Sequence, residues 1–353
     1  MSSGAELTPG PGTGPAAELG TGPAAELGVG PAAEPGPPSR LGLGLAAVAR
    51  PAYITSGRTA DLGADRGVAA LRSHTWSTLD GAYSAGVRYL DVARSYGRAE
   101  DFLAGWLAVH PEVDDVEIGS KWGYRYVGGW RLDAEVHEIK DHSLAAYREQ
   151  IAETRALLGD RLDVYHVHSA TLDSGALDNP ELHRALAELR DTGVRVGIST
   201  SGPAQADAVR RALGITVAGA PLFTSIQSTW NVLETSVAPA LAEAAAAGAR
   251  VIVKEPVANG RLAPGGRDST AGSARAFEFA DRLGIPVDQL AIAAALAQPW
   301  AWRVLSGAVN PLQVASNTAA EAVVLPDDVL AELTELAEPA DRYWATRSAR
   351  SWR

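Results

Sequence analysis

Cysteine is absent from this sequence of 353 residues, and lysine occurs only three times. Without cysteine the chain forms no disulfide, no thiolate metal site and no cysteine nucleophile. The seven histidines are scattered, apart from His166 and His168, so the spacing of a zinc site is missing and no bound metal is expected. A Walker phosphate loop and a Gly-x-Ser-x-Gly nucleophile turn are missing too, which excludes the enzyme classes built on them.

Long apolar runs and an excess of positive charge are also lacking. The alanine-rich stretch 241–249 is too short to cross a membrane, and it contains Glu243. The N-terminus lacks the basic and apolar regions of a secretory signal. The net charge of −11 disfavours nucleic acid or an anionic membrane as the main partner. We therefore expect a soluble, cytoplasmic protein that binds neither nucleic acid nor a membrane. The sequence leaves its oligomeric state open.

Residues 1–39 form a low-complexity leader. An eight-residue repeat runs through it, as GPAAELGT, GPAAELGV and GPAAEPGP. This density of glycine and proline, with few large apolar residues, cannot bury a core, and the period is too short for a stacked solenoid. We predict a disordered leader, followed by one folded domain over residues 40–353.

Beyond residue 40, short apolar runs alternate with segments of helical periodicity. Strands are predicted over residues 40–46, 88–91, 116–120, 162–167, 196–199, 225–227, 251–254 and 304–306. Helices are predicted near 74–85, 99–109, 141–158, 180–191, 203–213, 235–247, 274–297 (two helices) and 311–320, with caps at Ser201-x-Pro203 and Asn310-Pro311. The strict alternation predicts a (β/α)8 TIM barrel. An open doubly wound sheet is the alternative, but the early turn Leu41-Gly-Leu-Gly-Leu45 lacks the third glycine of a dinucleotide-binding loop.

In such a barrel the active site forms at the carboxyl ends of the strands. The polar residues that end or closely follow the predicted strands are Asp91, Tyr96, Lys121, His168, Ser199, Gln227 and Lys254. Lys121 stands out because arginine supplies most of the positive charge in this chain, so a retained lysine suggests a titratable or compact cation. His166 is two residues before His168 on the same strand, so both side chains point to the same side. His166 lies deeper in the barrel, which favours a structural role for it. Ser199 and Gln227 could be ordinary loop hydrogen-bonding residues.

Several of these motifs, in their order along the chain, resemble the aldo-keto reductases, which are NAD(P)H-dependent (β/α)8 oxidoreductases. Residues 86–97 (GVRYLDVARSYG) resemble the strand-two motif of the family, 120–122 (SKW) its lysine strand and 163–168 (DVYHVH) its histidine strand. The resemblance covers roughly residues 40–325. It implies that Tyr96, Asp91, Lys121 and His168 are catalytic, with Tyr96 as the proton donor, Lys121 as its ammonium neighbour, Asp91 holding Lys121 and His168 orienting the carbonyl.

The same resemblance implies a nicotinamide cofactor. NADP is expected because it is usual in the family, and NAD is the alternative. The residues assigned to cofactor binding are Ser199, Gln227, Asn231, Lys254, Arg261, Ser306, Gly307, Asn310, Gln313 and Asn317. Three departures bear on this site. Where many members of the family have Ser-Asn, this chain has Ser199-Thr200. Lys254 occupies a position where many members stack an aromatic residue on the nicotinamide, and residues 306–313 contain no Lys or Arg to favour a 2′-phosphate.

The expected activity is reduction of the carbonyl of a small organic substrate to an alcohol. Trp122, Trp130 and Trp230 are predicted to contact that substrate, because aromatic walls around a few polar groups suit an organic carbonyl. Two alternatives remain open. One is an NAD-dependent sugar or alcohol dehydrogenase that works in the oxidising direction, and the other is a cofactor-binding auxiliary subunit with little turnover. The physiological substrate is not specified by the sequence.

Overall fold

A computed structural model describes residues 39–55, 57–266, 268 and 270–352. Apart from Ser39, the predicted leader lies outside the described residues. Within the described part of the chain, no helix combines the length and the apolar character needed to cross a membrane.

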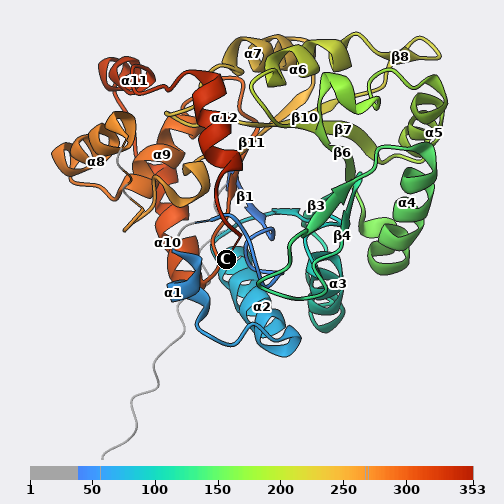
Figure 1. The fold of residues 1–353 in the computed structure, drawn as a ribbon, viewed down its shortest axis with the longest axis horizontal. Coiled ribbons are helices and arrows are strands. Elements are labelled where there is room, and N and C mark those ends of the chain that lie inside the picture. The colour runs from blue at the N-terminus through green and yellow to red at the C-terminus, as the bar shows by residue number, and fades with distance from the viewer. Residues whose placement is uncertain (1–38, 56, 267, 269, 353) are drawn as a thin grey trace, which may run out of the picture. The chain divides into compact units, whose positions relative to one another are not determined.

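Eight parallel strands form a closed barrel in the order β1-β12-β11-β10-β7-β6-β3-β2 (Figure 1). The predicted TIM barrel is confirmed, and the open sheet is wrong because β1 pairs with both β2 and β12. Each strand overlaps its predicted range. Their bounds are β1 Leu41–Gly44, β2 Tyr89–Asp91, β3 Glu117–Trp122, β6 Val164–Ala170, β7 Arg195–Thr200, β10 Ser225–Thr229, β11 Arg250–Lys254 and β12 Arg303–Ser306.

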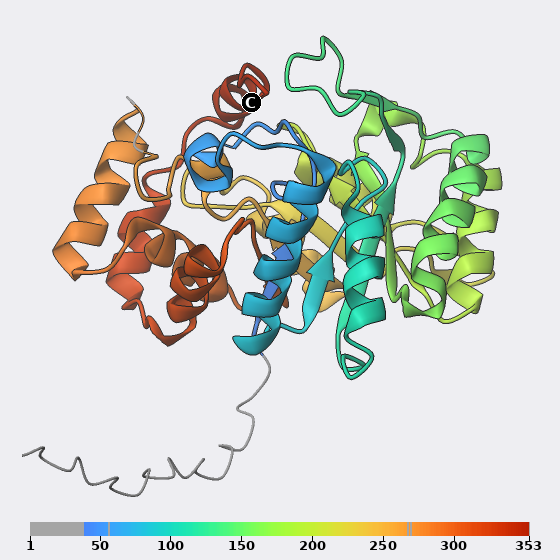
Figure 2. The same cartoon turned by 90° about the horizontal axis from the view of Figure 1, so that it is seen from below.

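The helices surround the barrel (Figures 1 and 2). Those predicted from the sequence correspond to α2 Val68–Ser84, α3 Ala99–Val109, α4 Leu144–Leu158, α5 Pro180–Asp191, α6 Gln205–Leu213, α7 Ala238–Ala246, α8 Ala271–Leu283, α9 Val287–Leu296 and α10 Pro311–Ala319. The predicted division of 274–297 is confirmed, since Gly284 ends α8 with φ 68° and Pro286 caps α9. Asn310 caps α10 as expected, whereas α6 begins only at Gln205 and leaves Ser201 in the preceding loop.

Along each barrel strand, every second side chain points into the barrel interior. Tyr89, Val164, Ile252 and Leu305 form an apolar cluster of their own inside it. Tyr89 needs the absence of a side chain at Gly119, because a Cβ there would lie 2.3 Å from the Tyr89 hydroxyl. Asp91 and Lys121 lie two residues further along the same strands and have the same parity, so they lie above this cluster, toward the carboxyl ends.

Several elements that the sequence did not predict complete the fold. A hairpin of β4 Tyr124–Tyr126 and β5 Glu138–Lys140 follows β3, and a smaller one joins β8 Thr216–Val217 to β9 Ala220–Pro221. The remaining helices are α1 Arg58–Leu62, α11 Asp327–Thr334 and α12 Ala340–Ser348. Figure 2 shows α12 and the long loop of the β4–β5 hairpin on the same side of the barrel.

Candidate active site

A buried ion pair lies at the carboxyl ends of β2 and β3. Lys121 Nζ donates to Asp91 Oδ2 at 2.5 Å and to the Val92 carbonyl at 3.0 Å. Gln227, on β10, donates from Nε2 to the other Asp91 oxygen at 2.7 Å. Lys121 is fully buried and Asp91 is 2% exposed. Because both carboxylate oxygens are occupied, Asp91 fixes the position of Lys121 and keeps a charge beside it.

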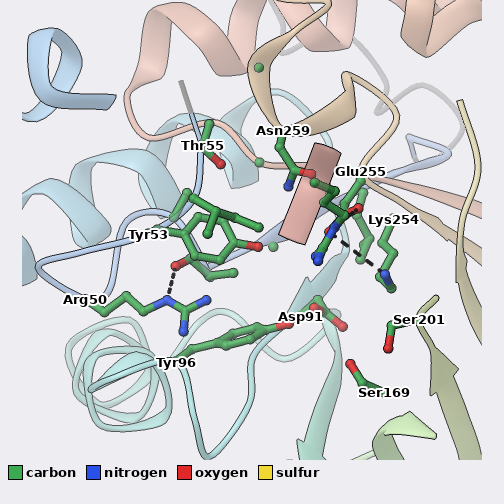
Figure 3. Close-up of a pocket in the computed structure, with 18 of the residues that line it drawn as sticks. Arg50, Tyr53, Thr55, Asp91, Tyr96, Ser169, Ser201, Lys254, Glu255 and Asn259 are labelled. Atoms are coloured by element: carbon green, nitrogen blue, oxygen red, sulfur yellow. Dashed lines mark hydrogen bonds and ion pairs between the residues drawn. The ribbon is translucent and has the colours of Figure 1, made fainter. Parts of the chain in front are cut away.

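Tyr96 and His168 lie next to this pair. Lys121 Nζ is 4.7 Å from the centre of the Tyr96 ring, and the Tyr96 and His168 rings meet edge to face with centroids 5.4 Å apart. Figure 3 shows the Tyr96 hydroxyl pointing into the cavity toward Asp91. The structure therefore brings together all four residues predicted to be catalytic. A carbonyl oxygen in this space could accept hydrogen bonds from both the phenol and the imidazole.

Both of these groups are held in their uncharged forms. Burial raises the pKa of Tyr96 well above 10, the charge of Asp91 raises it further, and Arg50 opposes the shift. In the resting site the charge of Asp91 compensates that of Lys121, so stabilisation of the phenolate by Lys121 stays a prediction for the step in which the proton leaves. Burial likewise takes the pKa of His168 well below 6.5, with Lys121 and Lys254 acting in the same direction. The resting site thus presents a neutral phenol and a neutral imidazole.

The backbone around His168 is irregular and tightly held. The pairing of β6 with β7 shifts register between Val167 and Ala170, and Ser169 has φ 51°, which is rare for a residue with a side chain. The Ser169 amide donates to Ser199 Oγ at 2.8 Å, and His142 Nε2 lies 2.8 Å from the His168 carbonyl oxygen. The irregularity lies directly beside His168, and the Ser199 hydroxyl stabilises the backbone there by its hydrogen bond to the Ser169 amide. Strain of this kind is typical of functional sites.

A cavity of about 390 Å³ opens above these residues. Asp91, Tyr96 and His168 line it, and Lys121 lies directly behind Asp91. Figure 3 shows Arg50, Tyr53 and Tyr96 on one side and Lys254, Glu255 and Asn259 on the other. The volume lies within the range of small-molecule sites, and the walls mix apolar residues with many polar and charged side chains.

Arg50 is a member of the site that sequence reasoning missed. Its guanidinium is 2% exposed and donates to Glu138 Oε1 at 2.6 Å. It also lies 4.2 Å from the Tyr53 ring centre, 5.0 Å from that of Tyr96 and 4.9 Å from that of Trp352. A lone charge within the apolar segment 41–54 was the available signal. Apart from the nearby Tyr53, its partners come from distant parts of the chain, among them Glu138 of β5, and only the folded structure shows them.

The opposite wall is built around Glu255, which has φ 57° and immediately follows β11. Both Glu255 carboxylate oxygens pair with Arg347 of α12, with Nε to oxygen distances of 3.1 and 3.0 Å. Burial opposes ionisation of Glu255, but Arg347 and Lys254 hold its pKa far below 4.5. Lys254 Nζ donates instead to Thr229 Oγ1 at 2.5 Å. Neither Glu255 nor Arg347 was predicted, since α12 was not recognised in the sequence.

Among the residues predicted to bind cofactor, Gln227, Lys254 and Gly307 line the cavity. The other predicted residues do not line it: Ser199, Asn231, Arg261, Ser306, Asn310, Gln313 and Asn317. Their side chains bond to protein groups instead. Asn231, for example, donates to the Glu255 carbonyl and to the Tyr343 hydroxyl, both at 3.0 Å, and Arg261 pairs with Asp268 and Glu338.

The three tryptophans predicted to contact the substrate do not line the cavity. Lys121 points into the barrel, so Trp122, the next residue on β3, points outward and packs against Tyr147 of α4 with ring centroids 5.1 Å apart. Trp230 packs edge to face on Trp300, and Trp130 donates from Nε1 to the Arg66 carbonyl. Aromatic composition alone could not show which way these rings point. The aromatic residues that line the cavity are Tyr53, Tyr96, Tyr124 and Trp352.

Comparison with known proteins agrees with this geometry. The sequence profile of the aldo/keto reductase family matches residues 63–338, well over half of the chain. The chain belongs to the aldo/keto reductase family. It is therefore an oxidoreductase of a family that uses nicotinamide cofactors.

Individual proteins that resemble this chain share only about a quarter of its sequence or less. A D-threo-aldose 1-dehydrogenase from a Pseudomonas species is 26% identical over 291 residues, which span 74% of this chain and 87% of that protein. The holo form of an aldo-keto reductase from Bacillus halodurans superposes with a TM-score of 0.62 at 23% identity, covering 85% of this chain and 93% of that one. A glycerol dehydrogenase from Gluconobacter oxydans also gives a TM-score of 0.62, at 22% identity, covering 85% and 92%. At these identities the two solved structures support the fold alone.

Proposed function

We propose that this aldo/keto reductase reduces the aldehyde or ketone carbonyl of a small organic substrate to an alcohol with NAD(P)H, and that Tyr96 donates the proton. The observation that carries the proposal is the assembly of Tyr96, His168 and the Lys121–Asp91 pair at one end of the barrel. These groups come from three strands and one loop, and they face a cavity of suitable size. Structural packing does not require a buried Lys–Asp pair beside a buried phenol.

The residues present fit a nicotinamide cofactor. Gly307 lines the cavity, and a Cβ built on it meets no protein atom within 4 Å, so a planar group has room there. Ser201 and Asn259 add a hydroxyl and an amide to the lining, and Gln227 a second amide. Gln227, Lys254 and Gly307 would hold the cofactor, which would supply the hydride.

Each catalytic side chain then has a separate task. The neutral imidazole of His168 donates a hydrogen bond that orients the carbonyl oxygen. The Tyr96 phenol gives its proton to that oxygen as negative charge develops on it. The ammonium of Lys121 stabilises the phenolate that remains, and Asp91 holds this ammonium in position. Arg50, whose guanidinium carbon is 5.0 Å from the Tyr96 ring centre, adds a second cation beside the phenolate.

The oxidising direction uses the same residues in reverse, and two observations favour it as a second candidate. The Pseudomonas relative at 26% identity is named as a dehydrogenase of D-threo-aldoses. A cavity with several charged and hydroxyl-bearing side chains also suits a polyhydroxylated substrate. On this reading Tyr96, as the phenolate, would accept the proton of the substrate hydroxyl.

Steady-state kinetics test the proposal and its alternatives together. Purified protein is assayed with NADPH and with NADH against a panel of aldehydes and ketones, and with the oxidised cofactors against aldoses and alcohols. We expect turnover of an activated aldehyde, with NADPH preferred by family habit. Cofactor binding without turnover of any substrate would favour the auxiliary-subunit alternative. If the protein bound neither NADPH nor NADH, the proposal would be overturned.

Substituting Gly307 by Val is expected to weaken binding of reduced cofactor by about tenfold or more. The Cβ of the new side chain would meet no protein atom within 4 Å at this cavity wall, so we expect the midpoint of thermal unfolding to change little. Fluorescence titration with NADPH and NADH measures the affinity, and Gly307→Ala should give a smaller loss. Equal affinities in the wild type and Gly307→Val would show that this segment does not contact the cofactor.

A further inference from the structure

The charged side chains at the cavity carry more positive than negative charge. Among the residues that the structure describes, four cations and three carboxylates lie in or directly behind its lining: Arg50, Lys121, Lys254 and Arg347 with Asp91, Glu138 and Glu255. Three cations have a carboxylate of their own, as the pairs Arg50–Glu138, Lys121–Asp91 and Arg347–Glu255. His168 adds no charge, because burial keeps its pKa well below 6.5. One positive charge is left over.

That charge belongs to Lys254. Its Nζ donates to the Thr229 hydroxyl, and the nearest carboxylate oxygen among the described residues, Glu255 Oε1, is 4.0 Å away. Glu255 is already engaged by Arg347 through both oxygens. The side chain of Lys254 is only 15% exposed, so solvent screens its charge weakly. Among the described residues, this weakly screened ammonium therefore shares its nearest carboxylate, that of Glu255, with Arg347.

We propose that the ammonium of Lys254 makes the cavity discriminate between the two redox states of its cofactor, binding the reduced form more tightly than the oxidised form. The proposal rests on the function proposed above. The nicotinamide ring is a cation when oxidised and neutral when reduced, whereas the phosphates carry the same charge in both states. An excess positive charge therefore repels only the oxidised ring, and the ratio of the two dissociation constants isolates this effect. In the reducing direction it favours capture of the reduced cofactor and release of the oxidised product.

The titration of Lys254 makes the discrimination dependent on pH. Burial lowers the pKa of Lys254 to about 8, an effect that Glu255 and Asp91 oppose and that Arg347 and Lys121 reinforce. Lys254 is charged below this pH and neutral above it, so the preference should be present near neutral pH and fade as the pH rises. The pKa of Glu255 lies far below this window and that of Arg347 above it. Burial also lowers the pKa of Lys121, so variants must separate the two lysines.

Isothermal titration calorimetry of the full chain with oxidised and reduced cofactor, near pH 7 and near pH 9.5, tests the proposal. In the wild type, the ratio of the oxidised to the reduced dissociation constant should fall by about tenfold between the two pH values. Lys254→Met keeps the apolar part of the side chain without the charge. Its ratio of dissociation constants should therefore equal the wild-type value near pH 9.5 at both pH values. Lys254→Arg, which stays charged, should show the high ratio at both.

Two results would overturn the proposal in distinguishable ways. If the wild type binds both forms and Lys254→Met leaves the ratio at pH 7 unchanged, the role of Lys254 is wrong and the proposed function stands. If the wild type binds neither form, the proposed function fails and the proposal fails with it. The pH dependence of the wild type requires no substitution, and its absence would count against Lys254 even if the variants failed to fold.

Discussion

Replacing Tyr96 by Phe is expected to lower kcat by about a thousandfold and to change the dissociation constant of the reduced cofactor by less than about twofold. The ring of Tyr96 packs edge to face with His168 and lies beside Lys121, and phenylalanine preserves these contacts. Only the proton donor is removed. Binding and steady-state turnover of an aldehyde, measured on the same preparation, give both quantities.

Tyr53→Phe is the matched control for this experiment. Tyr53 lines the same cavity and lies closer to Arg50 than Tyr96 does, at 4.2 Å against 5.0 Å between the guanidinium carbon and the ring centre. Tyr53 takes no part in the proposed proton transfer, so the loss of kcat in Tyr53→Phe should stay below about tenfold. Near-normal turnover in Tyr96→Phe would contradict the assignment of the proton donor. Equal losses in both variants would indicate that the cavity needs its phenols for shape or polarity instead.

The barrel could be predicted from the sequence because its signals are local. Apolar runs of strand length alternate with amphipathic helices, and a polar residue closes most strands, as Asp91 closes β2 and Lys254 closes β11. Parallel strands in a barrel end on the same face, so these residues had to meet. Their side-chain parity followed too, which placed His166 a layer below His168. His166 is fully buried and lies 2.9 Å from the Ser225 hydroxyl through Nε2.

The remainder of the site depends on long-range contacts that no local pattern shows. Arg50 meets Glu138 across 88 positions of sequence, and Glu255 meets Arg347 across 92. The same limit explains the tryptophans. Trp122 is next to Lys121 in the sequence, but strand alternation directs it to the helices and away from the cavity. Asn231 and Arg261 match family segments, yet their hydrogen bonds go to the protein itself. A residue type at an aligned position does not reveal which way its polar atoms point.

The second large effect is expected for Lys121→Met, which should reduce both activity and stability. Removing the ammonium leaves the buried carboxyl group of Asp91 without its cationic partner and with Gln227 as its remaining side-chain partner among the described residues. Breaking a buried ion pair from one side costs about 3–5 kcal/mol, because an uncompensated charge remains in the interior. Denaturant unfolding followed by circular dichroism measures the loss. Lys140→Met is the matched control, since Lys140 is an exposed lysine on β5 and its removal should cost less than about 0.5 kcal/mol.

The double variant Asp91→Asn/Lys121→Met separates the two consequences. Neutralising Asp91 removes the stranded charge, so most of the lost stability should return, giving a coupling energy of about 2–3 kcal/mol in the double-mutant cycle. Activity should not return, because the phenolate formed at Tyr96 would still lack the ammonium 4.7 Å from its ring centre. Recovery of both would mean that the pair serves stability alone. Recovery of neither would mean that Lys121 supports the fold through contacts other than Asp91. Recovered folding without turnover is the outcome that assigns Asp91 to holding Lys121, and Lys121 to the chemistry of Tyr96.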